Sequence, residues 1–115
     1  MLASQYRLKK SREITRVLQR GVFKSVGVMT IKFHKNGQDF SRVAIVVSKK
    51  VSKKAVVRNK IRRRISGVLE DKWGTVAGGY DIVMVVREDI SELAAPQLAS
   101  RVVSLFERSQ IVKGK

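Results

Sequence analysis

The segment 55–73 constrains the fold most, because its apolar residues recur every three or four positions. Val57, Ile61 and Ile65 fall on one stripe of a helix that turns by about 100° per residue. Only Gly67 weakens the pattern, because glycine disfavours helix interiors. We therefore predict one long amphipathic helix whose apolar stripe packs on a sheet.

A dense run of positive charge begins just before this helix and continues into it. Residues 49–64 hold nine lysines and arginines in sixteen positions, with no acid. Residues 1–64 carry nineteen basic and two acidic side chains, whereas residues 65–115 carry six and seven. The net charge of +16 is therefore a patch, which a polyanion would normally relieve. A basic face kept only for solubility would carry interspersed acids, and none occurs from residue 40 to 69.

Two kinds of polyanion could relieve this charge, a nucleic acid and an anionic membrane. A helix that lies on a membrane turns a broad apolar face with Trp, Phe or Leu to lipid. Here the core needs the apolar stripe, Trp73 is the only tryptophan, and no apolar run approaches the roughly 20 residues of a membrane span. We therefore expect a nucleic-acid partner and no membrane. Charge alone leaves DNA and RNA open, since phosphates dominate binding to both.

The other elements follow from shorter patterns. Residues 11–21 show helical apolar spacing with a glycine at the end, and residues 29–34 alternate between apolar and polar. Residues 43–47 and 80–86 are apolar runs typical of buried strands. The pair Asn36-Gly37 marks a reversal, so we predict a hairpin between the amphipathic strand and a more deeply buried strand at 43–47.

The last element and the domain organisation complete the prediction. Pro96 suits the first turn of a helix that we expect to extend through Glu107. The expected order is αβββαβα, in which one strand before the long helix is not located on the sequence. The chain has no repeat, linker or low-complexity tract, so we expect one α+β domain over residues 1–115, with its core at about 8–110.

Several classes of function lack the residues they need. The absence of cysteine removes disulfides, thiol nucleophiles and thiolate metal sites, and it fits a reducing compartment. No secretory signal is visible at the start, so we expect a cytoplasmic protein. His34 is the only histidine and the nine acids lie scattered outside the basic run, so we expect neither a zinc site nor a self-contained active site.

Three stretches resemble one known family, the bacterial ribonuclease P protein component. "SRVAIVVSKKVSKKAVVRNKIRRR", residues 41–64, resembles the family signature, in which S-K-K precedes R-N-x-x-[KR]-R. "LKKSREITRVLQRG", residues 8–21, resembles the family's opening helix, and "YDIVMVVRE", residues 80–88, its last strand. The resemblance covers about residues 8–110, and the combination of both motif halves at this spacing is specific.

The resemblance implies more than the patterns alone can give. The implied fold is a single-domain α/β sandwich like domain 2 of ribosomal protein S5, with a left-handed βαβ crossover around the basic helix, against the usual right-handed rule. The implied function is that of the protein subunit of ribonuclease P, the endonuclease that removes the 5′ leader of precursor tRNA. In this family the RNA performs the chemistry with Mg²⁺ that RNA mainly places, so no catalytic residue and no metal ligand is expected in the protein.

The implied partners are ribonuclease P RNA and precursor tRNA, with one protein per catalytic RNA. The residues that match R-N-x-x-[KR]-R correspond to the family's contact with the catalytic RNA. Arginine suits phosphate oxygens because its guanidinium is a fork of donors, and asparagine can both donate and accept. Together with nearby lysines these residues form what we call the basic ridge. The basic ridge consists of Lys49, Lys50, Lys53, Lys54, Arg58, Asn59, Lys60, Arg62 and Arg63.

The family's cleft for the tRNA leader lies across the sheet face near the first helix. The resemblance places Lys10, Arg12, Ile14, Leu18 and Phe33 there. Aromatic residues are common in the family at the positions of Ile14 and Leu18, where this chain has aliphatic ones. We therefore expect Phe33 and the stems of Lys10 and Arg12 to carry more of the contact with the leader.

Two other functions would share the basic ridge. One is a non-catalytic RNA binder, such as a ribosomal protein or an RNA chaperone, and the other is a DNA-coating protein. Both predict sequence-tolerant binding that falls steeply with salt. The ribonuclease P hypothesis predicts in addition that a large RNA gains turnover on precursor tRNA when the protein is added.

Overall fold

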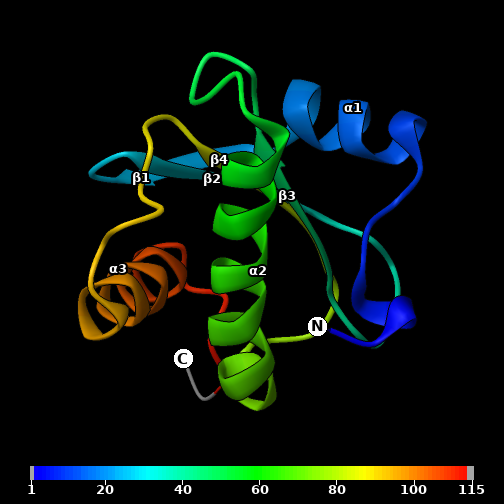
Figure 1. Ribbon diagram of the computed structural model, residues 1–115. Coiled ribbons are helices and arrows are strands. Elements are labelled where there is room, and N and C mark those ends of the chain that lie inside the picture. Colours follow the sequence, from blue (N-terminus) through cyan, green and yellow to red (C-terminus); the bar gives the residue numbers. More distant parts are fainter. Residues whose placement is uncertain (1, 114–115) are drawn as a thin grey trace.

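A four-stranded sheet stands between helices on its two faces (Figure 1). The computed structural model describes residues 2–113. The expected order αβββαβα is confirmed, with two additional short 3₁₀ helices, and β1 is the strand that the sequence pattern did not locate. In chain order the elements are η1 Ser4–Tyr6, α1 Ser11–Arg20, β1 Val22–Val26, β2 Met29–Lys35, β3 Arg42–Val47, α2 Ala55–Lys72, η2 Trp73–Thr75, β4 Tyr80–Val86 and α3 Ala95–Arg108.

The strands lie in the order β1-β2-β4-β3. β1 pairs with β2 and β2 with β4 in antiparallel fashion, whereas β3 runs parallel to β4. Because α2 joins these two parallel neighbours, the structure contains the βαβ unit that the resemblance implied. The left-handed sense of its crossover stays a prediction.

The predicted hairpin at Asn36-Gly37 is wrong, because β4 lies between β2 and β3. The loop after β2 instead passes the start of β4, where the Asn36 N–H donates to the Gly79 carbonyl over 2.9 Å. Gly78 permits this passage, since a Cβ at that position would lie 2.2 Å from the Asp39 carbonyl oxygen. A turn signal shows that the chain reverses, but it does not show which strand becomes the neighbour.

The predicted depth of the strands also needs correction. β3 was expected to be buried more deeply than β2, yet it is an edge strand in which only Val43 and Val47 are fully buried. β4 takes the central position, and five of its seven residues are buried. An apolar run therefore predicted a strand at 43–47 correctly, whereas its place in the sheet depended on pairing with a segment far along the chain.

The main core lies on the face of the sheet that packs against α2 and α3. The deepest side chains of α2 are Ile61, Ile65 and Leu69, which are 0%, 0% and 1% exposed. Val57, in the first turn, is half-buried against this core. The predicted apolar stripe is confirmed, and its centre lies at least one turn beyond Val57.

The opposite face of the sheet is covered by α1. A smaller apolar cluster of Leu8, Val17 and Val83 lies there, with Ile14 packed against it. α1 contacts β2 and β4. The sheet thus separates α1 from α2 and α3, and this arrangement sets the two candidate surfaces described next.

Candidate nucleic-acid interface

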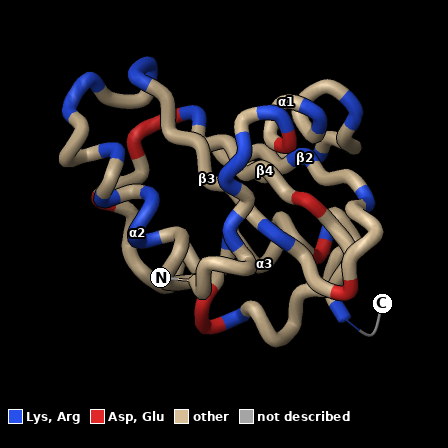
Figure 2. The backbone as a smooth tube through the Cα atoms, turned by 90° about the vertical axis from the view of Figure 1, so that its right-hand side faces the viewer, with Lys and Arg blue, Asp and Glu red and all other residues tan. Residues whose placement is uncertain are grey.

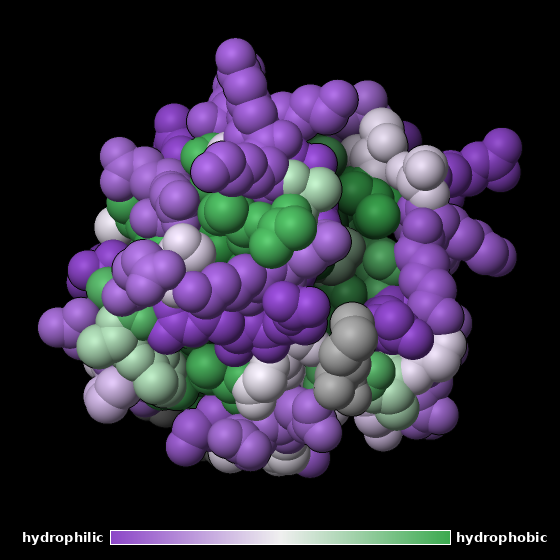
Figure 3. Space-filling model, in the orientation of Figure 1, coloured by the Kyte–Doolittle hydropathy of each residue, from purple (hydrophilic) through white to green (hydrophobic). Residues whose placement is uncertain are grey.

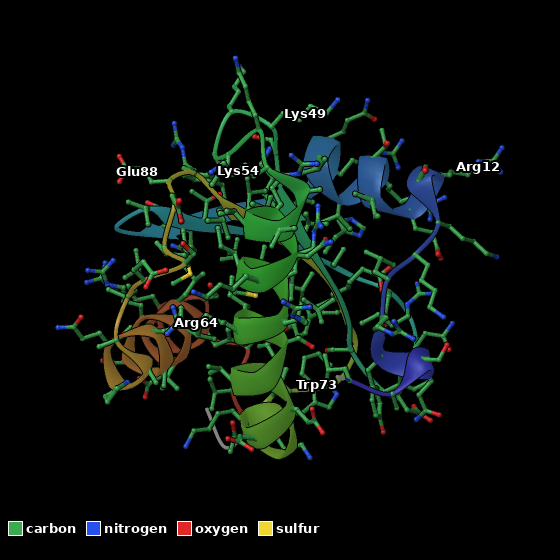
Figure 4. All side chains as sticks on the ribbon, in the orientation of Figure 1. Arg12, Lys49, Lys54, Arg64, Trp73 and Glu88 are labelled. Carbon is green, nitrogen blue, oxygen red and sulfur yellow. The ribbon has the colours of Figure 1, made fainter. Side chains whose placement is uncertain are left out.

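The basic ridge begins in the loop before α2. Lys49, Lys50, Lys53 and Lys54 are all exposed there, and Lys49 lies at the periphery of the molecule (Figure 4). α2 begins after Lys54 with no acidic residue in its first turn and no side-chain cap. The N–H groups of this turn therefore add the positive end of the helix dipole to the lysine charges.

Two arginines of α2 hold the ridge in shape. Arg58 Nη1 donates to the Ser52 carbonyl over 2.9 Å, which ties the loop to the helix. Arg62 donates from Nη1 to Asn59 Oδ1 over 2.7 Å and from Nη2 to the Val47 carbonyl over 3.3 Å. A guanidinium has five N–H donors, so both arginines keep donors for a phosphate, and the internal bonds fix where those donors point.

Arg63 differs from these two arginines, because its side chain is exposed on the outer side of α2. Within residues 2–113, no hydrogen bond or ion pair engages the side chains of Arg63 and the four loop lysines. Figure 2 shows Lys and Arg segments of the loop, of α2 and of α1 gathered in the upper half of the view. These cations are therefore available to a polyanion.

The ridge ends where α2 meets the loop after β4. Lys60 Nζ lies 3.0 Å from Glu92 Oε1. Arg64 donates from Nη1 to the carbonyls of Ile90 and Ser91 over 3.1 and 2.8 Å, and from Nη2 to the Leu93 carbonyl. These contacts turn both cations toward residues 87–94, and Arg64 is labelled in Figure 4. Of the predicted ridge residues, Lys60 is thus the one whose charge is already partly neutralised.

The same loop carries exposed acids of its own. Asp89 Oδ1 accepts from the Ser91 N–H over 2.9 Å. Hydrogen bonds from Ser91 lower the pKa of Asp89, so this carboxylate stays ionised near neutral pH. Its neighbour Glu88 is also exposed and lies at the periphery (Figure 4). These carboxylates would therefore repel a polyanion on this side of the ridge.

A cleft of about 270 Å³ opens beside the ridge, between α1 and α2 at the edge of β3. Its lining includes Ile14 of α1, Ala44 of β3 and Arg62 of α2. Figure 3 shows hydrophobic atoms in a hollow beside α2, with hydrophilic residues around it. Because Arg62 belongs to both the ridge and the cleft, the two surfaces are continuous.

Four of the five predicted leader residues lie on α1 or at its start. Lys10 and Arg12 are exposed, and Arg12 lies at the periphery (Figure 4). Ile14 lines the cleft, and Leu18, one turn later, is 36% exposed. The structure therefore places three of these residues on α1 and Lys10 directly before it, and their contact with a leader stays a prediction.

The fifth leader residue, Phe33, is misplaced by the prediction. Phe33 is only 9% exposed and belongs to the main core, on the face opposite to α1. Its ring lies edge-on to Tyr80, with 5.8 Å between the ring centroids. The alternation in β2 defined two faces correctly, but it could not show which face meets which helix. Phe33 is therefore a core residue and not part of a leader cleft.

Two residues that the sequence reasoning missed lie on the α1 face instead. Lys32 is directed to this face and donates from Nζ to the Leu18 carbonyl over 2.6 Å. Phe23 of β1 is the register partner of Lys32, and it is 52% exposed. No sequence signal assigned Phe23 to a face, because β1 itself was not located.

An ionic cluster fixes α1 to the sheet. Arg42 of β3 donates to both oxygens of Asp81 in β4, from Nε to Oδ1 over 2.8 Å and from Nη2 to Oδ2 over 2.7 Å. The same Nη2 lies 3.0 Å from Glu13 Oε2 of α1. The hydrogen bonds with Asp81, above all, raise the pKa of Arg42. Because Glu13 is the only acid of α1, its pairing with Arg42 leaves the other charges of that helix positive.

Residues 2–113 contain no group of three or more His, Cys, Asp or Glu side chains that could hold a metal ion. None of their helices has the length and apolar character needed to cross a membrane.

Comparison with known proteins decides the family. The family model for ribonuclease P matches residues 2–110, nearly the whole chain. The chain belongs to the ribonuclease P family. The resemblance in the S-K-K and R-N-x-x-[KR]-R motifs is thereby confirmed.

Relatives in the ribonuclease P family match along most of their length. The ribonuclease P protein component of Roseiflexus castenholzii is 33% identical over 110 residues, which cover 95% of this chain and 89% of the relative. The component from a Cyanothece species is 29% identical over 130 residues and 99% of both chains.

Solved structures of the family share the fold. The ribonuclease P protein of Thermotoga maritima superposes with a TM-score of 0.81 at 28% identity, over 89% of this chain and 96% of that one. The Staphylococcus aureus protein gives 0.82 over 92% and 96%, and its 24% identity supports the fold alone. The predicted α+β class is therefore confirmed, and the alternative of a ribosomal protein or RNA chaperone is not favoured.

Membership in the ribonuclease P family connects the chain with an endoribonuclease complex. It does not assign roles to single residues, so the roles of the basic ridge and of the leader residues stay predictions. The structure shows which of these side chains are exposed to a partner and which already form hydrogen bonds or ion pairs within the protein.

Proposed function

We propose that the chain is the protein subunit of a ribonuclease P in which an RNA subunit performs the chemistry. In this proposal one protein binds one catalytic RNA through the basic ridge and contacts the 5′ leader of precursor tRNA beside α1. The observation that carries it is a set of cations around the start of α2 with no partner within residues 2–113, next to a cleft that shares Arg62 with the ridge. A cytoplasmic location is part of the same proposal, and the absence of cysteine fits it.

The ridge is built to dock on RNA backbone. Arg58 and Arg62 are held by bonds within the protein, so little side-chain freedom is lost when their remaining donors meet phosphates. Arg63 and the loop lysines add charge without such constraint. The ordered guanidinium groups of Arg58 and Arg62 then fix the position of the protein on the RNA. The lysines contribute electrostatic attraction that does not depend on the RNA sequence.

The surface beside α1 suits a single strand that leaves the ridge. Arg62 joins the ridge to the cleft, and Lys10 and Arg12 continue the positive charge along α1. A strand on this path passes Ile14 and then Leu18, which offer apolar contact but no aromatic ring. The protein would thereby orient the leader relative to an RNA held on the ridge.

Mg²⁺ belongs to the proposed holoenzyme, held mainly by RNA. Mg²⁺ is usually bound through one or two carboxylates together with phosphate oxygens and water. The described residues contain no group of three or more His, Cys, Asp or Glu side chains, and Glu92, which contacts the ridge, is engaged by Lys60. In this proposal the protein's own residues are not required to hold Mg²⁺. Their contribution is to bind, to orient and to reduce the repulsion between two RNA molecules.

A cleavage assay at low Mg²⁺ tests the proposal. Precursor tRNA is incubated with a bacterial ribonuclease P RNA, with the protein, and with both. We expect cleavage at the mature 5′ end to rise sharply only when both are present. Cleavage by the protein alone would show an active site in the protein. Tight RNA binding without stimulation across several such RNAs would favour the non-catalytic RNA binder.

Matched variants locate the effect on the ridge. Arg63→Ala removes an exposed arginine of the ridge, and Arg108→Ala removes an exposed arginine at the end of α3, outside the ridge. The proposal expects the stimulation to fall with Arg63→Ala and to persist with Arg108→Ala. Equal losses would show that only total charge matters.

A further inference from the structure

Most of the exposed large apolar residues among the described residues lie in one short stretch of the chain, where α1 leads into β1. Among the described residues, the large apolar side chains that are clearly exposed are Leu18, Val22, Phe23 and Val56. Three of them lie within six positions, at the end of α1 and the start of β1. Single exposed apolar residues need no explanation, but a group that includes a half-exposed aromatic ring does.

The register of the sheet shows where Phe23 lies. Phe23 pairs with Lys32, and Lys32 pairs with Val83, which belongs to the apolar cluster beneath α1. Phe23 is therefore on the α1 face of the sheet. Lys32 donates to the carbonyl of Leu18, so it joins the C-terminal end of α1 to the strand pair that carries Phe23.

The neighbouring residue Val22 lies on the other face. It pairs with Phe33, which belongs to the main core. Val22 is 54% exposed and Phe23 is 52% exposed, so the two side chains are equally accessible on opposite sides of one strand. They form a natural pair for comparison.

The charge around Phe23 indicates which partner it meets. Residues 7–35 carry nine lysines and arginines and a single acid, Glu13, which is engaged by Arg42. A second copy of this chain would bring the same cations against one another. A nucleic acid would instead neutralise them, and an exposed aromatic ring among cations is the usual platform for an unpaired base.

We propose that Phe23 is a stacking residue for an unpaired nucleobase of single-stranded RNA, with Lys32 beside it for a neighbouring phosphate. This inference rests on the proposed function in one respect, since it takes the strand to be the leader of precursor tRNA. It assigns to Phe23 the aromatic contact that the sequence assigned to Phe33. A duplex would not use this site, because its bases are stacked on one another.

Direct binding separates stacking from simple apolar contact. A labelled single-stranded oligouridylate and a blunt RNA duplex of the same length are titrated with the full chain and followed by fluorescence anisotropy. Phe23→Leu keeps an apolar side chain without the ring, Phe23→Tyr keeps the ring, and Val22→Ala is the matched control on the other face. Thermal melts establish that each variant is folded.

We expect Phe23→Leu to weaken binding of the single strand by about fivefold to a hundredfold, because stacking on an aromatic side chain contributes that much per base. Phe23→Tyr and Val22→Ala are expected to bind as the parent does, and affinity for the duplex is expected to stay the same in every variant. Unchanged binding of the single strand by folded Phe23→Leu would overturn the inference. So would an equal loss for the duplex, or a change of oligomeric state on sedimentation.

A second assay ties the inference to the leader. Cleavage by the reconstituted ribonucleoprotein is measured on precursor tRNA with an ordinary leader and with a leader of abasic nucleotides. We expect Phe23→Leu to raise KM for the ordinary leader and to leave the abasic one unaffected. If no RNA is stimulated by the parent protein, the proposed function fails, and the oligouridylate titration still decides the role of Phe23.

Discussion

Arg42 and Asp81 are register partners across the parallel strands β3 and β4, and their side chains form a two-pronged ion pair with N–O distances of 2.8 and 2.7 Å. Their side chains are only 22% and 12% exposed, so water screens the pair weakly. The same guanidinium reaches Glu13 of α1. Arg42 therefore links α1, and with it the surface beside the ridge, to the paired strands β3 and β4.

Arg42→Ala is expected to lower the free energy of unfolding by about 1–3 kcal/mol, because Asp81 would keep a mostly buried carboxylate without its cation. Urea unfolding at neutral pH measures this. Glu13→Gln is the control, since it keeps the Arg42–Asp81 pair, and its loss should stay below about 1 kcal/mol. Equal losses in the two variants would show that the pair with Asp81 is not the main contribution.

The pH dependence of this cluster has a defined sign. Hydrogen bonds, first of all with Asp81, raise the pKa of Arg42. A group with a raised folded-state pKa contributes stability that is fully present below its unfolded pKa and is lost only as pH rises through the folded value. The stability difference between the parent and Arg42→Ala should therefore be the same at about pH 7 and about pH 9. A difference that shrinks over this range in urea unfolding would contradict the assignment.

Arg63→Ala should weaken RNA binding and Arg64→Ala should lower stability, although the two residues are adjacent. Arg63 is exposed, so its loss is expected to weaken RNA binding by about 1–2 kcal/mol without changing stability. Arg64 donates to three carbonyls of residues 90–93, so its loss should destabilise the fold by about 1–3 kcal/mol. Filter binding and thermal unfolding on both variants test this contrast, and a reversed pattern would contradict the outward orientation of Arg63.

The salt dependence of RNA affinity measures how many phosphates the ridge contacts. Each neutralised phosphate contributes about −0.9 to the slope of log affinity against log salt on a duplex. Replacing Lys50 and Lys53 together by Gln should therefore make the slope about 1.8 less negative and weaken binding to different RNA sequences alike. Titrations of a ribonuclease P RNA at several salt concentrations measure it. An unchanged slope would place both lysines outside the contact, and a flat response in the parent protein would exclude RNA backbone as the partner.

Local periodicity explains why much of the fold was predictable. The bounds of α1, α2 and α3 follow from apolar spacing and from signals such as Gly21 and Pro96, which act within a few residues. The outward direction of the ridge residues on α2 was predictable for the same reason. Once residues 55–72 form a helix with its stripe inward, the direction of Asn59 and Arg63 is fixed by geometry alone.

Pairing between distant segments explains why the rest was not predictable. β4 lies between β2 and β3, and no sequence signal near Asn36 indicates this strand order. The wrong assignment of Phe33 to the leader cleft, and the failure to identify Phe23, have the same cause. A strand has two faces, and only packing against α1 on one side and α2 and α3 on the other decides which of them is buried. Phe23 needed the further step of locating β1, a strand of five residues.

Burial along α2 predicts unequal effects for two residues of one stripe. Ile61→Ala should lower the free energy of unfolding by about 2–5 kcal/mol, because Ile61 is 0% exposed and its truncation leaves a cavity. Val57→Ala should cost less than about 1.5 kcal/mol, since Val57 is half-buried and water can reach the site. Urea unfolding of both variants measures the difference. Similar losses would mean that the first turn of α2 is packed as tightly as its centre.

Two glycines are expected to respond to alanine in opposite directions. Gly67 lies inside α2, is exposed, and leaves open space around a Cβ, so Gly67→Ala should stabilise the fold by about 0.5–1 kcal/mol through helix propensity and a less flexible unfolded chain. Gly78→Ala should destabilise it, because the new Cβ would meet the Asp39 carbonyl oxygen at 2.2 Å where the loop after β2 passes the start of β4. Thermal unfolding compares the two. Gly67→Ala should also bind RNA as the parent does, since Gly67 lies outside the basic ridge. A stabilised Gly78→Ala would contradict the close passage that separates β2 from β3.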